Sequence, residues 1–335
     1  MIKQRDKKID VLYTIGIFLV LLGHSHPSDW TLFENTFFEE VIVFIYTFHM
    51  ALFFFIAGYL LENSHSIENY GYKKWIWEKA VRLLIPYIVL SVGALYPKYF
   101  LENHMMPTVK ILFTTIFNPR KGVWGHFWFI PVLLMCYIFF GLWKRFTINH
   151  NKKIMTIIML IISLGLYLLP LHTDWLGFND FKEACIFVGI GIIVKQIVPQ
   201  KHENVLQKSH IICRIICIIA AVGLNVFMMR IERMHMLISL ASAGIMIFAC
   251  WELSILIGGN KFTLWVSSHN FTIYIYSWLF QAVFMGICGI LEIPWYITSV
   301  AMFIIGFAGP VVMIIIYEKL AKKHKRVFDL ILGLK

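Results

Sequence analysis

The chain has 335 residues, of which 59% are hydrophobic and 15% charged, with a formal net charge of +11 and a mean hydropathy of +0.73. Soluble domains typically contain about 45–50% apolar and about 25% charged residues, so this composition excludes an ordinary soluble enzyme. No basic block lies in a polar, foldable segment, which argues against a nucleic-acid-binding protein. We therefore predict an all-α, polytopic membrane protein.

The apolar residues gather in ten segments of nearly the length that a helix needs to cross a bilayer, about 20 residues. The predicted spans are 9–26, 41–61, 80–97, 124–143, 154–170, 181–198, 211–229, 235–257, 266–290 and 295–318. The longest linkers, 62–79 and 98–123, are too short to form a separate domain. The first segment has no small-residue cleavage site behind it and is predicted to be retained. We expect one integral domain over residues 1–335, a bundle of about ten transmembrane helices.

The basic residues are distributed unevenly between the predicted loops. With the N-terminus inside, 23 of the 30 Lys and Arg residues fall on the inner side and seven on the outer side. The acidic residues divide almost evenly, which leaves about +14 inside and about −3 outside. Cytoplasmic loops of membrane proteins carry this excess of Lys and Arg. The charge therefore predicts that both termini are cytoplasmic, with anionic lipid as the simplest partner of the basic groups.

Six cysteines stand singly within apolar runs, without a CxxC motif: Cys136, Cys185, Cys213, Cys217, Cys250 and Cys288. Free cysteine behaves there as a small apolar side chain. The sequence thus indicates neither a disulfide framework nor a cysteine metal site.

The first span carries Asp10, Tyr13 and His24 on one face, since at 100° per residue Asp10 and His24 lie about 40° apart and Tyr13 and His24 are almost three whole turns apart. Asp10 and Tyr13 lie near the inner end, and His24 lies about 21 Å further out at 1.5 Å per residue. Polar groups at membrane depth are costly and are therefore candidates for function. The alternative is that Asp10 is an N-terminal helix charge and His24 an interfacial histidine.

The second span begins outside, so His49 lies in the same outer half of the bilayer as His24. A neutral imidazole is a suitable general base, and a second one can position the acceptor. The alternative for His49 is a hydrogen-bonded histidine between helices. His126 adds a third histidine at this level, but no HxxxH spacing or paired carboxylate supports a metal site. Trp124 and Trp128 beside it are interface anchors or stacking platforms for a sugar.

Two further polar features lie in later segments. Asn270, Tyr274, Ser277 and Gln281 follow one another at helical spacing and form a polar stripe, which lines either a helix–helix seam or a hydrated cavity. Arg82 stands at the inner start of the third span, after three lysines, where it could bind the phosphates of a cytoplasmic cofactor or snorkel to lipid headgroups. Walker A, GxGxxG, GxSxG and HExxH motifs are missing from the sequence. Direct transfer from a bound donor therefore fits better than a covalent enzyme intermediate.

Four blocks occur in order along the chain: residues 5–24, which end in Leu22-Gly23-His24; residues 48–59, which read FHMALFFFIAGY; Arg82 to Tyr87, which read RLLIPY; and Phe127 to Pro131, which read FWFIP. Together they resemble the acyltransferase-3 family of bacterial integral membrane acyltransferases, near its fucose 4-O-acetylase-like members. The resemblance implies a ten-helix bundle that takes an acyl group, often acetyl, from cytoplasmic acyl-CoA. The implied acceptor is a hydroxyl on an extracytoplasmic or lipid-linked glycan.

The resemblance also implies roles for individual residues. His24 matches the essential histidine of the first span, His49 the second histidine, and Arg82 the arginine of the RLLIPY block. This sequence departs from the family at Tyr13, where Arg or Lys is common, and at Ser277, which replaces a late histidine. Tyrosine cannot pair with a phosphate as arginine does. A divergent donor, a divergent acceptor or lost activity would each account for these departures.

We predict an acyl-CoA-dependent O-acyltransferase of the bacterial cytoplasmic membrane, with no tightly bound cofactor, no metal and no nucleic-acid partner. Its partners would be acetyl-CoA or another acyl-CoA, a glycan or lipid-linked sugar, and membrane lipids. The rival hypotheses are a transporter or flippase with mobile elements at Pro86, Gly306 and Pro310, and a catalytically silent relative. The candidate residues are His24, His49 and Asp10 for catalysis, Arg82, Tyr13 and Arg5 for the donor, and Trp128, His126, Asn270, Tyr274 and Ser277 for the acceptor.

Overall fold

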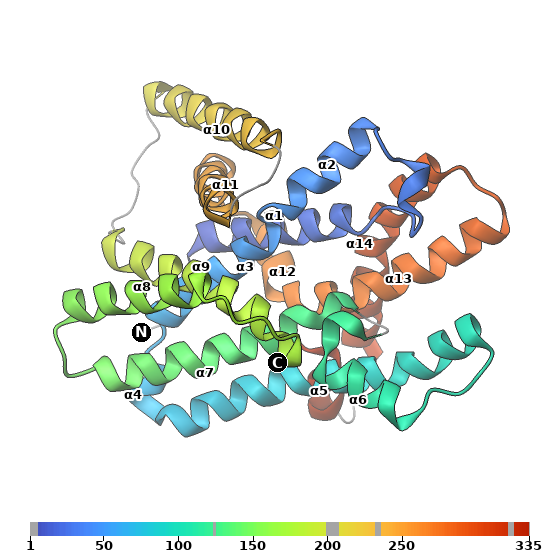
Figure 1. Cartoon of the computed structure of the whole chain (residues 1–335), viewed down its shortest axis with the longest axis horizontal. Coiled ribbons are helices and arrows are strands. Elements are labelled where there is room, and N and C mark those ends of the chain that lie inside the picture. Colours follow the sequence, from blue (N-terminus) through green and yellow to red (C-terminus); the bar gives the residue numbers. More distant parts are fainter. Residues whose placement is uncertain (1–5, 123–124, 199–207, 232–235, 321–324, 335) are drawn as a thin grey trace. The chain divides into compact units, whose positions relative to one another are not determined.

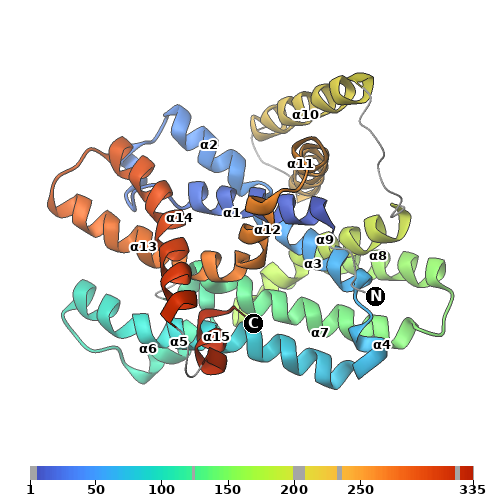
Figure 2. The ribbon, with the colours of Figure 1, turned by 180° about the vertical axis from the view of Figure 1, so that it is seen from behind.

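The structure is a computed structural model that describes residues 6–122, 125–198, 208–231, 236–320 and 325–334. Every regular element in these ranges is helical, and Figures 1 and 2 show them from opposite sides. The α-helices are α1 (Lys7–Gly23), α2 (Phe37–Tyr46), α3 (His49–Asn63), α4 (Ser66–Tyr70), α5 (Tyr72–Asn103), α6 (Val109–Phe117), α7 (Phe129–Thr147), α8 (Lys152–Leu168), α9 (Phe178–Ile197), α10 (Lys208–Met229), α11 (Met236–Ile257), α12 (Lys261–Ser268), α13 (Asn270–Ile290), α14 (Trp295–Leu320) and α15 (Lys325–Leu332). Short 3-10 helices are η1 (Trp30–Leu32), η2 (Pro119–Lys121), η3 (Gly125–Trp128) and η4 (Trp175–Gly177).

The all-α prediction is confirmed, and each of the ten predicted segments corresponds to helix. In the described part of the chain, seven stretches are long and apolar enough to cross a membrane: α2 with α3, α5, η3 with α7, α10, α11, α13 and α14. Of the others, α1 and α8 have 17 residues each, and α9 carries charged residues in its first turns. The total of ten spans and the cytoplasmic position of both termini stay predictions.

The second predicted span, 41–61, is two helices. At the junction, Thr47 and Phe48 donate their amides to the carbonyls three residues back, those of Phe44 and Ile45, each at 3.2 Å. Such bonds tighten the turn, as in a 3-10 helix. The junction sets His49 at the first position of α3.

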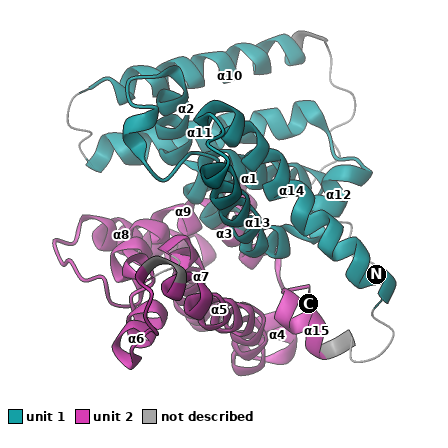
Figure 3. Cartoon of the chain, turned by 90° about the vertical axis from the view of Figure 1, so that its right-hand side faces the viewer, with its two compact units in different colours: residues 1–56, 200–322 teal, residues 57–199, 323–335 magenta. Residues whose placement is uncertain are grey.

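The chain divides into two compact units, coloured separately in Figure 3. Unit 1 contains residues 1–56 and 200–322. In it, α1 packs against α2, α11, α12, α13 and α14. Asp6 caps the start of α1, where its carboxylate accepts the amide of Lys8 at 3.1 Å. The α1 residues Leu12, Ile17 and Leu21 are almost completely buried, so α1 is the central helix of this unit.

Unit 2 contains residues 57–199 and 323–335. Its helices pack in the series α4, α5, α7, α9 and α8, and α15 lies against α5. The approach of α3 to α9 depends on Gly58, because a Cβ atom at this position would lie 2.0 Å from the carbonyl oxygen of Val188. No side chain larger than hydrogen fits there without displacing the α9 backbone.

We predict that Gly58→Ala destabilises the protein by about 1–3 kcal/mol, the usual cost of overpacking a core. Thermal unfolding of the detergent-purified protein measures this change. The matched control is Gly165→Ala in α8, where nothing lies within 4 Å of the added Cβ and helix propensity alone favours alanine by up to about 1 kcal/mol. Equal melting temperatures of the two variants would contradict the close packing of α3 on α9.

Candidate functional site

His24 follows the last turn of α1 directly, and all the carbonyl groups of this turn have donors. An α-helix leaves its last four carbonyls without intrahelical partners. Here the amide of His24 donates to Val20 at 3.0 Å, and Nε2 of Gln281 donates to Leu21 at 3.0 Å. Ser25 donates its hydroxyl to Leu22 at 2.8 Å, and the hydroxyl of Tyr46 donates to Gly23 at 2.6 Å.

This capping holds the backbone of His24 from three parts of unit 1. The donors come from the segment after α1, from the end of α2 and from the middle of α13. Because a buried carbonyl that loses its donor costs about 1–3 kcal/mol, the bonds to the buried residues Leu21 and Gly23 are costly to break. The position of the His24 ring therefore depends on residues far from it in the sequence.

Aromatic rings surround the imidazole of His24. The ring of Trp278 lies edge-on at a centroid distance of 5.6 Å, and that of Tyr46 lies at 6.2 Å. His24 itself is partly exposed. It is also close enough to His49 and His26 for their charges to interact with it. The prediction from the sequence that His24 and His49 share one region thus agrees with the arrangement within unit 1.

His49 has a defined hydrogen-bonding role. Its Nδ1 lies 2.9 Å from the carbonyl oxygen of Ile45, which can only accept, so Nδ1 carries the proton of the neutral ring. The other nitrogen, Nε2, then has a lone pair and can accept a proton or a hydroxyl hydrogen bond. The ring is buried, with 7% exposure, and lies 5.3 Å from the ring of Tyr46.

Tyr46 and His26 complete this group, which we call the histidine–tyrosine cluster: His24, His26, Tyr46 and His49. The hydroxyl of Tyr46 lies 3.2 Å from Nε2 of His26, and Nδ1 of His26 lies 2.7 Å from the carbonyl of Pro27. Neither residue stands out in the sequence, and Tyr46 lies within a run that reads as one continuous apolar span. Its position three residues before His49 was the available signal.

The structure separates Asp10 and Tyr13 from this cluster along α1. Asp10 is buried, with 4% exposure, in the first turn of the helix, and the ring of Tyr13 lies 6.3 Å from that of Phe53. Thr14 donates its hydroxyl to the carbonyl of Asp10 at 2.9 Å. Arg5 lies outside the described residues.

The polar stripe of α13 lies largely in a helix–helix seam. Besides its bond to α1, Gln281 fills the space beside Gly306 of α14, where a Cβ would lie 2.8 Å from the amide carbon. Ser277 is buried and donates to the carbonyl of Tyr274 at 3.0 Å. Asn270 donates to the carbonyl of Ser267 at 2.6 Å. A ring of α13 that does approach His24 is that of Trp278, which is not part of the polar stripe.

The remaining candidates belong to unit 2. Arg82 lies in α5, is partly exposed, and has no hydrogen-bond or ion-pair partner among the described residues. The Trp128 ring is covered on one face by the guanidinium of Arg120 at 4.1 Å. Arg120 in turn holds both carboxylate oxygens of Asp180 through Nε, at 2.9 and 2.8 Å. The His126 ring lies 4.3 Å from that of Phe127.

An ion pair joins two connecting segments of unit 2, the one before α7 and the one before α9. Nζ of Lys121 lies 2.5 Å from the Asp174 carboxylate, and this hydrogen bond lowers the pKa of Asp174 below its usual value. Both side chains are exposed to a large degree, so the pair is worth little in stability. Among the described residues, no group of three His, Cys, Asp or Glu side chains could hold a metal ion.

Comparison with known proteins agrees with this arrangement. A family model described as an acyltransferase domain matches residues 6–318, and thus runs through segments of both units. The chain belongs to the acyltransferase-3 family. This membership confirms the resemblance inferred from the four sequence blocks, and with the apolar helices it indicates a multi-pass membrane acyltransferase.

One relative of this acyltransferase-3 chain is the nodulation protein NolL of Mesorhizobium japonicum (strain LMG 29417 / CECT 9101 / MAFF 303099). It is 28% identical over 138 residues, which are 40% of this chain and 35% of NolL. The match therefore covers about a third of the relative's length. No solved structure matches the chain.

We predict that Gln281→Leu destabilises this acyltransferase by about 1–3 kcal/mol, because the carbonyl of Leu21 is then buried without its donor. Thermal unfolding in detergent measures the effect. Val283→Leu, an exposed position on the same helix, is the control and should leave the melting temperature unchanged. A wild-type melting temperature for Gln281→Leu would show that α13 does not hold the last turn of α1.

Proposed function

We propose that the protein is an O-acyltransferase of the bacterial cytoplasmic membrane. It moves an acyl group, with acetyl as the first candidate, from cytoplasmic acyl-CoA to a hydroxyl of an extracytoplasmic or lipid-linked glycan. The observation that carries the proposal is the histidine–tyrosine cluster of unit 1 in a chain of the acyltransferase-3 family. Acyl-CoA acts as a substrate in this proposal, and no tightly bound cofactor is required.

In the proposed reaction, the oxygen of the acceptor hydroxyl attacks the carbonyl carbon of the thioester. The hydroxyl proton passes to His24 as general base. The C–S bond breaks, and the departing thiolate takes up the proton, so that an O-acyl ester and CoA are formed. His49 orients the acceptor or shares its proton, which is supported by the lone pair that its bond to the Ile45 carbonyl leaves on Nε2.

The other candidate residues are assigned by position. Asp10 is proposed to support catalysis from the opposite end of α1. Arg82, Tyr13 and Arg5 would handle the donor, and Arg82 is the best suited of them because its planar guanidinium pairs with phosphate oxygens in a bidentate manner. His126, Trp128, Asn270, Tyr274 and Ser277 are the proposed contacts of the acceptor.

We predict that His24→Ala and His49→Ala each lower acyl transfer by about 10²–10⁴-fold, the usual contribution of a positioned acid or base. Transfer of radiolabelled acetyl groups from acetyl-CoA to membrane glycans by the purified protein measures this effect. His172→Ala, at an exposed loop position, is the control. Transfer that survives in His24→Ala would overturn the assignment of the base, and solute movement without any transfer by the wild type would favour a transporter.

A second prediction concerns the donor. Arg82→Ala should weaken acyl-CoA binding by about tenfold to 100-fold, which corresponds to the loss of a charge-assisted hydrogen bond of about 1.5–3 kcal/mol, and Arg82→Lys should restore part of it. Isothermal titration with CoA measures the affinity. Arg145→Ala, an exposed arginine at the end of α7, is the matched control. Equal CoA affinity of Arg82→Ala and wild type would remove Arg82 from the donor site.

A further inference from the structure

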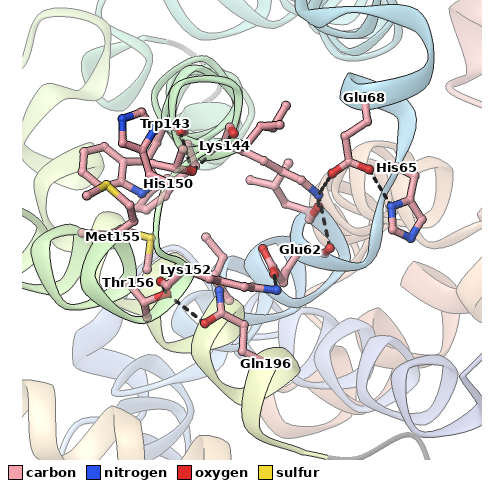
Figure 4. A pocket seen from close by; sticks show the side chains of 16 residues that line it. Glu62, His65, Glu68, Trp143, Lys144, His150, Lys152, Met155, Thr156 and Gln196 are labelled. Atoms are coloured by element: carbon pink, nitrogen blue, oxygen red, sulfur yellow. Dashed lines mark hydrogen bonds and ion pairs between the residues drawn. The ribbon is translucent and has the colours of Figure 1, made fainter.

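Unit 2 contains a pocket of about 280 Å³ that the proposed acyl transfer does not use. It lies where four helix ends meet, and Figure 4 shows its lining from close by. Glu62 comes from the end of α3, Lys144 from the end of α7, Lys152 from the start of α8 and Gln196 from the end of α9. Because these are ends of long apolar helices, the pocket lies at the level of the lipid headgroups. The charge distribution predicts that this is the cytoplasmic side.

The charges around the pocket are balanced. Nζ of Lys152 lies 2.6 Å from the carboxylate of Glu62, and Nζ of Lys144 lies 3.6 Å from that of Glu68. Glu68 also receives a hydrogen bond from His65 at 2.6 Å. Partial burial by itself would raise the pKa of Glu68, but its bond to His65 and the charge of Lys144 outweigh that effect and lower the pKa. The Glu68 carboxylate is thus stabilised in its charged form, and two ion pairs line the pocket wall.

The two lysines differ in what they can offer to a ligand. Lys144 is mostly buried, with 13% of its side chain exposed, and its ammonium donates to the carbonyls of Leu61, Glu62 and Ser64 at the end of α3. Its donors are used within the protein. The side chain of Lys152 is 68% exposed, so it can turn toward a bound group while its carboxylate partner stays in the wall.

The arrangement of charges around the pocket favours a ligand that carries both a positive and a negative charge. An anion would meet the carboxylates of Glu62 and Glu68, and a cation would meet the two lysines. A group that carries a positive and a negative charge about a headgroup length apart avoids both costs. Carboxylates also bind best to a cation with N–H donors, which a primary ammonium has and a trimethylated one lacks.

The lining also has an apolar part. Trp143, Met155 and Met159 form part of the wall. The opposite face of α8 exposes Ile154, Ile157 and Ile161, which is the pattern of a surface in contact with lipid chains. A ligand with a polar head and an apolar tail thus matches the two kinds of wall.

We propose that this pocket binds the phosphoethanolamine headgroup of a membrane phospholipid. The ammonium of the lipid lies between Glu62 and Glu68, and its phosphate accepts hydrogen bonds from Lys152 and His150. The glycerol and the first chain carbons lie against Trp143 and Met155. This binding is independent of the acyl-transfer reaction.

The test is binding of short-chain lipids below their micelle concentration to the detergent-purified full chain. Dihexanoyl phosphatidylethanolamine should bind and raise the melting temperature. The phosphatidylcholine and phosphatidylglycerol of the same chain length should bind about tenfold more weakly or worse, a difference of about 1.4 kcal/mol. Equal binding of the three lipids would overturn the proposal, and this comparison needs no variant.

Variants then locate the site. Glu62→Gln, which keeps the shape of the side chain, and Lys152→Ala should each weaken phosphatidylethanolamine binding by about tenfold. Lys153→Ala is the matched control, since Lys153 is the exposed neighbour on α8 and does not line the pocket. Unchanged affinity in both pocket variants would overturn the assignment.

Two further ligands show whether the pocket binds a lipid headgroup, a free soluble compound or CoA. Free O-phosphoethanolamine should bind more weakly than the lipid, because it lacks the chains that lie along the apolar wall. Equally tight binding of the free compound would show that a soluble metabolite is the ligand and would overturn the lipid assignment. Displacement of the lipid by CoA that requires Lys152 would show instead that the pocket is a donor site.

Discussion

The last turn of α1 is the constraint on which the candidate site depends. A helix that ends within an apolar environment leaves carbonyl groups that must find donors. In this protein they are found in Ser25, in Tyr46 of α2 and in Gln281 of α13. The same residues that satisfy the backbone therefore bring together the rings around His24. The end of α1 and the candidate site are therefore held by the same residues. A change in α2 at Tyr46 or in α13 at Gln281 alters both.

The helices could be predicted from the sequence because an apolar run of span length has few alternatives to a helix in a membrane. The junction after Tyr46 could not, since the run 41–61 remains apolar through it and the tighter turn is a backbone feature. For the same reason the sequence does not distinguish Tyr46 from the other aromatic residues of this run. Helix α6 has nine residues and lies within the linker 98–123, and helix α15 has eight residues, so both are too short to form a span.

The candidate site was predicted unevenly. His24 and His49 could be placed in one region because both fall in the outer half of two consecutive predicted spans. Gln281 was selected as part of a polar stripe, but its partner, a backbone carbonyl of α1, has no sequence signal. Trp278 is one of many aromatic residues, and only the rotation of α13 against α1 distinguishes it from its neighbours. Long-range packing determines which residues of a helix face the site, and a single sequence does not show this packing.

Unit 1 is built from two segments far apart in the sequence, since residues 57–199 of unit 2 are inserted between them. The bond that caps α1 joins residues 260 positions apart. At a synthesis rate of about 5–20 residues per second, α1 waits on the order of 10–50 s for the helix that completes its last turn. During that interval the carbonyl of Leu21 lacks the donor that it has in the finished fold, so any partner it finds is temporary. A chain that ends before α13 can neither complete the capping of α1 nor place the Trp278 ring beside His24.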